Sequence, residues 1–198
     1  MSREALVIVD PQQRFTLDGA PFEVKDSAGT VARIETFAEA ARQNDVPVVW
    51  LTRNVRPQVG PGRRTSSTYD LSNFMGKWAE IDHRLTVDDR DIHIVKPRHS
   101  GFFGTDLEST LRQLEVDDLL IAGFTINVCC LATAVDAVAR DFGALLVSDL
   151  AGARDAGAGA DRIPASEIHR MTCDLFRYGL GSVTRAPDVL DRWSTQSM

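Results

Sequence analysis

The sequence predicts an α/β protein, built as a three-layer α/β/α sandwich around a mainly parallel central sheet. Short apolar runs rich in β-branched residues recur along the chain without polar alternation, as expected for strands that are buried on both faces. Segments whose apolar residues repeat every three or four positions lie between these runs, which is the spacing of amphipathic helices. This alternation of strand and helix requires parallel strands that are joined by right-handed crossovers.

Six apolar runs predict the strands of this sheet, and the last of them is weaker than the others. They lie at residues 5–9, 46–51, 91–95, 119–122, 144–147 and 181–184. The first run, Ala-Leu-Val-Ile-Val, contains no polar residue at all. A strand of this composition is expected where helices cover both faces of the sheet.

Four helices are predicted between the strands, three of them from apolar stripes. The stripes are Val31, Ile34, Phe37 and Ala41; Leu107, Leu111 and Leu114; and Ile168, Met171, Leu175 and Phe176. We expect Thr105 to cap the second of these helices, and Pro164 and Ser166 to open the last. The fourth helix is predicted at 132–142, where alanine is frequent, and Gly143 is expected to end it.

Composition limits the class of protein. The 198 residues suit a single domain, predicted to span 1–198, and 43% apolar with 25% charged residues is typical of a globular protein. A net charge of −6 argues against nucleic-acid binding, and no apolar run approaches the about 20 residues of a membrane span. The first strand starts too early for a signal peptide. Three cysteines predict neither a disulfide framework nor a zinc site, so we expect a cytoplasmic protein.

The connection between the second and third predicted strands is unusually long. From about residue 53 to residue 90 it contains Gly-Pro-Gly, paired arginines and a Ser/Thr run, which predicts a lid-like insertion. Its basic cluster comprises Arg53, Arg56, Arg63 and Arg64. Two interpretations stay open: the guanidinium groups bind a carboxylate of the substrate, or they belong to a solvated loop.

Three reactive side chains follow the carboxyl ends of predicted strands. Asp10 comes directly after the first strand, Lys96 after the third, and Cys129 a few residues after the fourth, where a helix starts. In an open parallel sheet, ligands bind beyond these strand ends, so the three side chains are expected to meet there. Each alone has an ordinary interpretation, as a capping aspartate, a solvated lysine or a buried thiol. The functional hypothesis rests on the presence of all three side chains at the ends of three different predicted strands.

Three blocks of the sequence resemble a known family. They are VDPQQRF at 9–15, VKPRHSGFF at 95–103 and GFTINVCCLATA at 123–134, the last followed by Asp136-Ala137. In this order they resemble the isochorismatase-like hydrolases, a superfamily that includes nicotinamidases, N-carbamoylsarcosine amidase and ureidoacrylate amidohydrolases. The resemblance runs from about residue 4 to about residue 184. It implies the isochorismatase-like sandwich fold, a cysteine hydrolase, and assembly as a homodimer or tetramer.

The resemblance implies that Asp10, Lys96 and Cys129 form the catalytic triad. The cysteine of the family lies six residues after the glycine of the third block, which selects Cys129 over Cys130. Isochorismatases proper lack a cysteine there, so its presence favours the amidase branch, which cleaves a C–N bond in a small ureido, carbamoyl or amide compound through a thioester. The second block is especially similar to ureidoacrylate amidohydrolases. The alternatives are vinyl-ether hydrolysis, which needs no thiol, and a binding protein without activity.

We expect the surroundings of Cys129 to activate its thiol. Lys96 and the helix N-terminus favour the thiolate and should lower its pKa, while Asp10 is placed to accept the proton and return it to the departing amine. The family implies that the backbone N–H groups of Thr125 and Cys129 hold the oxyanion. It also implies a cis peptide bond between Phe124 and Thr125.

We expect neither a metal nor another cofactor. Nicotinamidases carry an Asp-x-His pair after the second strand, where this sequence has Thr52-Arg53-Asn54. His99 has no partner at the spacing of metal ligands. The other histidines, His83, His93 and His169, are interpreted as structural or surface residues.

Substrate-binding residues are predicted from their positions near the triad. Phe15, Trp78 and Phe103 are candidates for the wall of a small apolar pocket, and Asn54 is a candidate for a hydrogen bond to the substrate. Ordinary packing of the rings and solvation of Asn54 are the alternative interpretations. The expected partner is a small molecule, with neither nucleic acid nor membrane involved.

Overall fold

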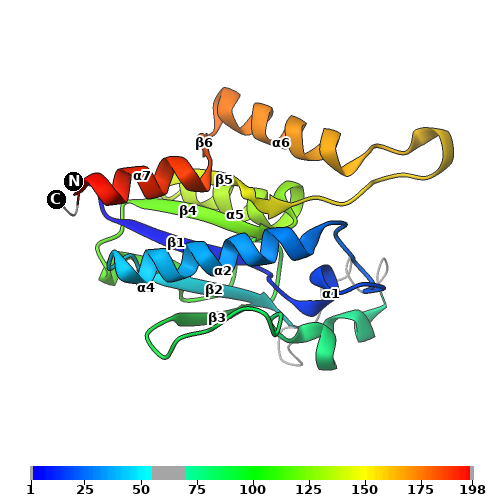
Figure 1. Cartoon of the computed structure of the whole chain (residues 1–198), viewed down its shortest axis with the longest axis horizontal. Helices are drawn as coiled ribbons and strands as arrows, with labels where there is room; N and C mark the ends of the chain where they lie inside the picture. Colours follow the sequence, from blue (N-terminus) through cyan, green and yellow to red (C-terminus); the bar gives the residue numbers. More distant parts are fainter. Residues whose placement is uncertain (1, 55–69, 197–198) are drawn as a thin grey trace.

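A six-stranded parallel sheet forms the centre of the molecule (Figure 1). The computed structural model describes residues 2–54 and 70–196. The sheet order is β3-β2-β1-β4-β5-β6, and every neighbouring pair is parallel. The strands are β1 (Glu4–Val9), β2 (Val48–Arg53), β3 (Ile92–Lys96), β4 (Asp118–Phe124), β5 (Gly143–Gly152) and β6 (Ser182–Thr184). The predicted α/β class and parallel sheet are confirmed.

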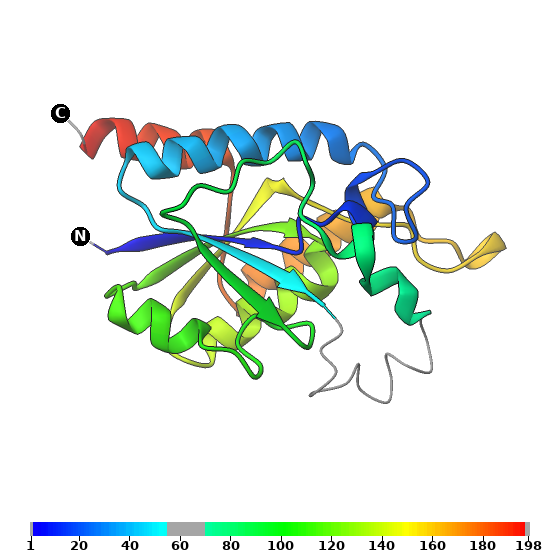
Figure 2. The same ribbon diagram turned by 90° about the horizontal axis from the view of Figure 1, so that it is seen from below.

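Helices cover both faces of the sheet and complete the three layers (Figure 2). One face carries α2 (Ser27–Gln43) and α7 (Ala186–Gln196), and the other carries α4 (Leu107–Gln113), α5 (Leu131–Val138) and α6 (Ala165–Gly179). The shorter helical turns are α1 (Gln13–Thr16), η1 (Leu71–Phe74), η2 (Gly76–Ala79), η3 (Ile126–Cys130) and η4 (Gly159–Asp161). In the described part of the chain, no helix is long and apolar enough to cross a membrane.

Alternate residues of the central strand contribute to two hydrophobic cores. Leu6 and Ile8 of β1 pack on the side of α2 and α7, whereas Ala5, Val7 and Val9 pack on the side of α4, α5 and α6. All five side chains are fully buried. Because neither face of the sheet meets water, the strand needs no polar alternation, as its sequence predicted.

The helix predicted at 132–142 begins and ends earlier in the chain than expected, and Gly143 does not end it. The helical segment of η3 and α5 covers 126–138, and the chain then turns through Asp141, which has a φ of 60°. Gly143 instead begins β5. A Cβ atom at Gly143 would lie 1.7 Å from Asp118 Oδ1 on β4, so only glycine fits beside this aspartate as it stands.

Two further helix predictions need correction. Thr105 lies one residue before the N-cap of α4, although its hydroxyl still accepts a hydrogen bond from the first N–H of the helix at 3.3 Å. In α6, Phe176 of the predicted stripe is buried, but Met171 and Leu175 are 45% and 64% exposed. Because α6 lies at the outside of the molecule (Figure 1), only one side of this helix meets the core.

The described part of the insertion, residues 70–90, packs against the body of the protein. Phe74 and Leu85 are buried, and the Asp82 N–H donates a hydrogen bond to Pro11 O at 2.9 Å. That the insertion acts as a lid stays a prediction. Three of its arginines lie outside the described residues: Arg56, Arg63 and Arg64.

Asp91 anchors the end of this insertion in the core. Its carboxylate accepts hydrogen bonds from Arg42 Nη2 at 2.7 Å and from Trp50 Nε1 at 2.8 Å. The Arg42 and Asp91 side chains are only 5% and 2% exposed. Removing one partner of such a buried ion pair leaves the other charge uncompensated in the interior.

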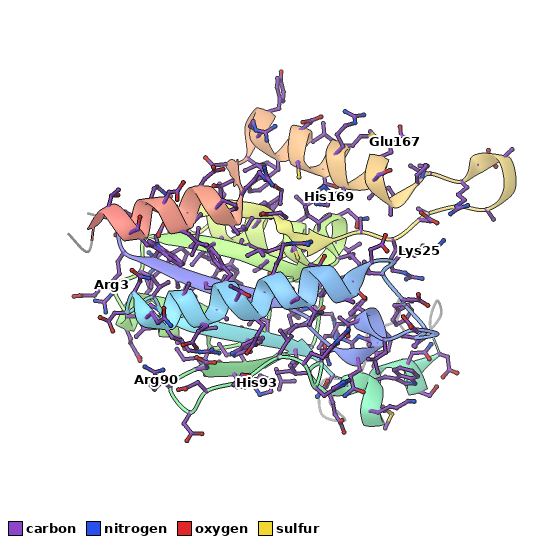
Figure 3. The ribbon with its side chains drawn as sticks, viewed as in Figure 1. Arg3, Lys25, Arg90, His93, Glu167 and His169 are labelled. Atoms are coloured by element: carbon purple, nitrogen blue, oxygen red, sulfur yellow. The ribbon has the colours of Figure 1, made fainter. Side chains whose placement is uncertain are left out.

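We therefore expect Asp91→Ala to lower the free energy of unfolding by about 3–5 kcal/mol, because the Arg42 guanidinium loses its buried counter-ion and keeps only the exposed Glu39 carboxylate. Urea unfolding followed by circular dichroism measures this loss. Arg90→Ala is the control, because Arg90 lies at the surface (Figure 3) with its side chain 71% exposed, and its removal should leave the midpoint nearly unchanged. Equal losses in the two variants would contradict the anchoring role of Asp91.

Candidate active site

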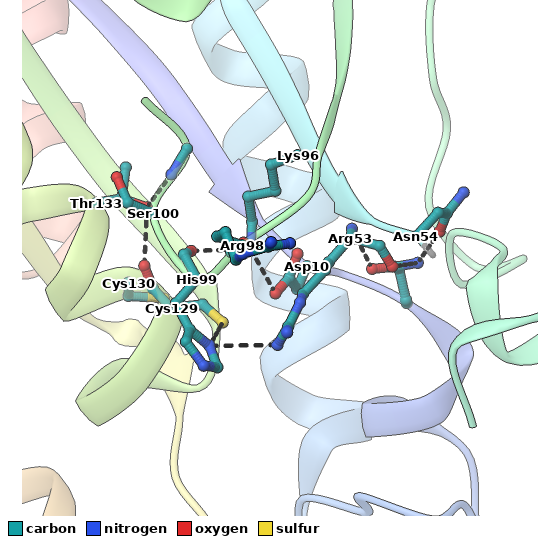
Figure 4. Close-up of polar contacts among 12 residues, drawn as sticks. Asp10, Arg53, Asn54, Lys96, Arg98, His99, Ser100, Cys129, Cys130 and Thr133 are labelled. Atoms are coloured by element: carbon teal, nitrogen blue, oxygen red, sulfur yellow. Dashed lines mark hydrogen bonds and ion pairs between the residues drawn. The ribbon is translucent and has the colours of Figure 1, made fainter. Parts of the chain in front are cut away.

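The three side chains predicted for the triad lie together at the carboxyl ends of the strands (Figure 4). Asp10 follows β1, Lys96 ends β3, and Cys129 lies in η3, which follows β4. Lys96 Nζ is 3.0 Å from Asp10 Oδ2, and both side chains are fully buried. Both groups also act electrostatically on the Cys129 thiol. The fold thus brings a carboxylate, an amine and a thiol to one place.

Lys96 is held by three hydrogen bonds. Its ammonium donates to Asp10 Oδ2, to Arg98 O at 3.1 Å and to His99 O at 2.9 Å. An ammonium group has three N–H donors, so each of them has an acceptor here. Lys96 therefore fixes the Asp10 carboxylate and the turn after β3 relative to each other.

Backbone conformation places the other two members of the site. Asp10 has a φ of 48°, a left-handed conformation that few residues other than glycine adopt, and this turns the chain directly after β1. Gly123 has a φ of 111°, and a Cβ atom there would lie 2.1 Å from Val9 O. Only glycine lets β4 approach β1 so closely. The Phe124–Thr125 peptide bond that follows is cis, as the resemblance implied.

A cavity of about 170 Å³ opens beside these residues. Three buried polar atoms on its lining residues make no hydrogen bond to any residue that the structure describes: Asp10 Oδ1, Arg14 Nε and Asn127 Oδ1. Buried polar groups in folded proteins are nearly always paired. Three such polar atoms on residues around one cavity mark it as the candidate binding site.

The remaining wall of the cavity is largely aromatic and cationic. It includes the rings of Phe15, Phe22 and Phe74, the arginines Arg53 and Arg154, and the residues His99, Thr125 and Val128. Sequence reasoning missed most of these residues because they lie on connections that have no periodic pattern. For Arg14 a signal did exist, since polar residues directly follow a strand that is otherwise fully apolar.

Of the four predicted substrate-binding residues, only Phe15 lines the cavity. Asn54 lies outside the wall, where its Oδ1 accepts a hydrogen bond from Gln12 Nε2 at 3.3 Å. Trp78 packs its ring against Lys77 Nζ, which is 4.3 Å from the ring centroid. Phe103 is 54% exposed, because the chain turns outward after the second sequence block. The three residues do not line this cavity within the described part of the chain, and their role in substrate binding stays a prediction.

The thiol of Cys129 is less acidic than we expected. Burial raises the pKa of Cys129 to about 12, against the opposing effect of the Lys96 ammonium, and the nearby Asp10 carboxylate raises it further. The expectation of a lowered pKa fails because removing the sulfur from water outweighs the attraction of Lys96. The resting site therefore holds a neutral thiol beside a carboxylate.

His99 contacts the thiol and was not assigned a role from the sequence. Its Nδ1 lies 3.5 Å from Cys129 Sγ and 3.3 Å from Arg53 Nη1. Burial, together with the charges of Arg53 and Lys96, lowers the pKa of His99 to about 4. The imidazole is therefore neutral at pH 7, and its Nδ1 is placed to accept a hydrogen bond from the Arg53 guanidinium.

The other histidines have ordinary environments. His93 lies on β3 and His169 on α6 (Figure 3), and neither lines the cavity. Each is hydrogen-bonded at 2.8 Å, His93 to Thr52 Oγ1 and His169 to Ser148 O. His83 is 67% exposed. Within residues 2–54 and 70–196, no three histidine, cysteine, aspartate or glutamate residues gather as metal ligands.

In the turn that carries Cys129, one carbonyl group accepts two backbone hydrogen bonds. The N–H groups of Val128 and Cys130 both donate to Thr125 O, at 3.1 and 3.2 Å. Cys130 Sγ lies 3.7 Å from Ala122 O and is fully buried in the interior, as expected for a packing residue. The oxyanion role of the Thr125 and Cys129 amides stays a prediction.

The sequence of this chain is similar to a family model and to those of known proteins. The family model for the isochorismatase domain matches residues 4–169. A ureidoacrylate amidohydrolase of Methylobacterium radiotolerans is 32% identical over 168 residues, which cover 73% of this chain and 65% of that protein. An N-carbamoylsarcosine amidase of Arthrobacter sp. is 29% identical over 167 residues, covering 79% and 62%. The chain thus spans just under two thirds of the length of these two relatives.

The fold has close counterparts among solved structures. The crystal structure of a cysteine hydrolase from Pseudomonas syringae pv. phaseolicola superposes with a TM-score of 0.91 at 29% identity. The match covers 98% of this chain and 93% of that one. The two proteins therefore share the complete sandwich architecture.

The raised pKa of Cys129 predicts how its reactivity depends on pH. The thiolate is the reactive form, so the rate of Cys129 alkylation by iodoacetamide should rise about tenfold per pH unit from pH 7 to 10, without a plateau. Mass spectrometry of the labelled peptide measures this rate, and the Cys129→Ala variant identifies the signal. A plateau near pH 7 to 8 would show that the thiol is activated at rest.

Proposed function

The chain belongs to the isochorismatase family, and we propose that it hydrolyses the C–N bond of a small ureido, carbamoyl or amide compound with Cys129 as the nucleophile. The observation that carries this proposal is the unpaired oxygen of Asp10. Lys96 binds Oδ2 of this carboxylate, while Oδ1 has no partner among the described residues and belongs to the wall that also carries the thiol. A proton acceptor is thus held beside a neutral nucleophile.

The first half of the proposed reaction forms a thioester. As Cys129 Sγ attacks the carbonyl carbon, the thiol proton passes to Asp10, so the sulfur never carries a full charge in the buried site. The carbonyl oxygen becomes an oxyanion, for which the backbone N–H groups of Thr125 and Cys129 are the proposed donors. Asp10 then returns the proton to the nitrogen, the C–N bond breaks, and ammonia or an amine leaves.

Water completes the proposed cycle. A water molecule attacks the thioester carbon while Asp10 accepts one of its protons. The C–S bond breaks, the sulfur regains a proton, and the acid product is released. Lys96 stays in place throughout, because its three donors bind the carboxylate of Asp10 and the carbonyl groups of Arg98 and His99. Each step uses side chains and backbone groups of the protein together with water.

Two further observations support this assignment. The cavity volume of about 170 Å³ suits a small metabolite rather than a peptide or a polymer. The relatives named above act, by their names, on ureidoacrylate and on N-carbamoylsarcosine, which are small compounds with a carbonyl group flanked by nitrogen. The proposal places this chain in the same reaction class.

The proposal predicts that ammonia release from a panel of ureido acids, carbamoyl amines and primary amides depends on the triad. Cys129→Ala and Asp10→Asn should each lower kcat by at least about 10³-fold, because each removes a group that takes part in bond making. Cys173→Ala is the matched control, since it removes a buried thiol that lies in α6, away from the cavity.

The thioester has its own test. Mass spectrometry of rapidly quenched enzyme should show a substrate-derived acyl group on Cys129, and none in Cys129→Ala. If Cys129→Ala retains full activity, for example towards a vinyl ether, the nucleophilic role of the thiol is refuted and acid-catalysed ether hydrolysis becomes the better assignment.

A further inference from the structure

Arg14 is a buried cation on the wall of the cavity. It lies in α1, directly after β1, and its side chain is fully buried. Its guanidinium donates to Arg53 O at 2.9 Å through Nη1 and to Gln12 Oε1 at 2.6 Å through Nη2. Both acceptors are neutral, and Nε has no partner in the described part of the chain. A guanidinium has five N–H donors, and these two bonds use only part of them.

The charges around the cavity favour an anion. Among the described residues, its wall carries two carboxylates, and each has a cation of its own: Asp10 pairs with Lys96, and Asp155 with Arg162. The same wall carries three arginines, Arg14, Arg53 and Arg154. Positive charge therefore exceeds negative charge at the cavity.

Arg14 stays charged at neutral pH in spite of this environment. Burial lowers the pKa of Arg14 to about 10, and the nearby charge of Arg53 acts in the same direction. The Asp10 carboxylate and Cys129 oppose this shift. A cation that is buried with only neutral acceptors is costly, and an anionic ligand would remove part of that cost.

Aromatic rings hold the guanidinium in a fixed position. The Cζ atom of Arg14 lies 5.1 Å from the centroid of the Phe15 ring and 4.8 Å from that of Phe74. Arg53 Cζ lies 5.0 Å from the centroid of the Phe74 ring, so the guanidinium groups of Arg14 and Arg53 both contact this ring. Because the Arg14 side chain is already ordered, it loses little conformational entropy when a ligand binds. This favours affinity and selectivity for ligands of matching geometry.

We propose that Arg14 binds a carboxylate group of the substrate, and that the preferred substrates are therefore ureido, carbamoyl or amide acids rather than neutral amides. The proposal rests on the proposed function for the identity of the reacting group, but the binding step needs no turnover. The planar guanidinium matches a carboxylate in shape and charge, and Nε is the donor that is still available. Because Arg14 and Cys129 line the same cavity, the acid group anchors the substrate beside the nucleophile.

Matched substrates test this inference by turnover. N-carbamoylglycine and N-carbamoyl-β-alanine are compared with N-(2-hydroxyethyl)urea and N-(3-hydroxypropyl)urea, which keep the ureido group but lack the charge. The wild type should prefer the acids by at least about 100-fold in kcat/KM, because the neutral compounds leave the buried cation unpaired. Arg14→Gln should lower kcat/KM for the acids by about 30-fold or more, and by a clearly smaller factor for the neutral compounds. Arg14→Lys should recover part of the loss.

Direct binding separates this inference from the proposed function. Isothermal titration of the Cys129→Ala variant with N-carbamoylglycine should show binding. A double variant that also carries Arg14→Gln should lose this binding. A double variant with Arg170→Gln is the surface control and should retain it, because the Arg170 side chain is 66% exposed. Circular dichroism verifies that each variant is folded, and the wild-type comparison of acids with neutral compounds needs no variant at all.

The outcomes distinguish the two claims. Equal turnover of acids and neutral compounds by the wild type, or equal losses on both in Arg14→Gln, overturns the carboxylate role and leaves the amidohydrolase proposal standing. Binding of the acids that depends on Arg14, without hydrolysis of any compound, supports the carboxylate site and counts against the proposed reaction. Absence of both binding and turnover for all four compounds overturns the carboxylate site.

Discussion

The candidate site depends on the buried ion pair between Lys96 and Asp10. It joins the ends of β3 and β1, which lie on either side of β2, and through Lys96 it also holds the turn that carries His99. Both charges are fully buried, so losing either one would leave the other uncompensated, at a cost of about 3–5 kcal/mol. The acid is therefore in position before a ligand arrives, and a site arranged in advance needs little reorganisation when charge develops.

Burial favours the neutral form of three further titratable groups of this cavity. It raises the pKa of the Cys129 thiol and lowers the pKa values of His99 and Arg14, in each case because the charged form loses its hydration. The thiol and the imidazole are consequently neutral at pH 7, whereas Arg14 keeps its charge because the ordinary pKa of a guanidinium lies far higher. A neutral thiol thus lies among fixed positive charges, and this arrangement suits an anionic ligand.

The fold and the convergence of three reactive side chains could be predicted from the sequence because both follow from the sheet. Unbroken apolar runs identified strands covered on both faces, and residues after such strands meet at one edge, which brought Asp10, Lys96 and Cys129 together. The rest could not be predicted, because it depends on contacts between distant segments. Phe74 belongs to a connection without periodicity, the exposure of Leu175 follows from the outer position of α6, and the pKa of Cys129 depends on a degree of burial that no local pattern reveals.

The reactive groups and the walls of the cavity come from different parts of the chain. Asp10, Lys96 and Cys129 lie at strand ends whose register is fixed by the sheet, whereas Phe22 and Phe74 are supplied by connections between elements. Divergence in such connections can reshape the chamber while leaving the chemistry intact, which is how one scaffold acquires new specificities. For protein engineers, residues 71–79 and the segment before α2 are accordingly the stretches to randomise when a different ligand is wanted.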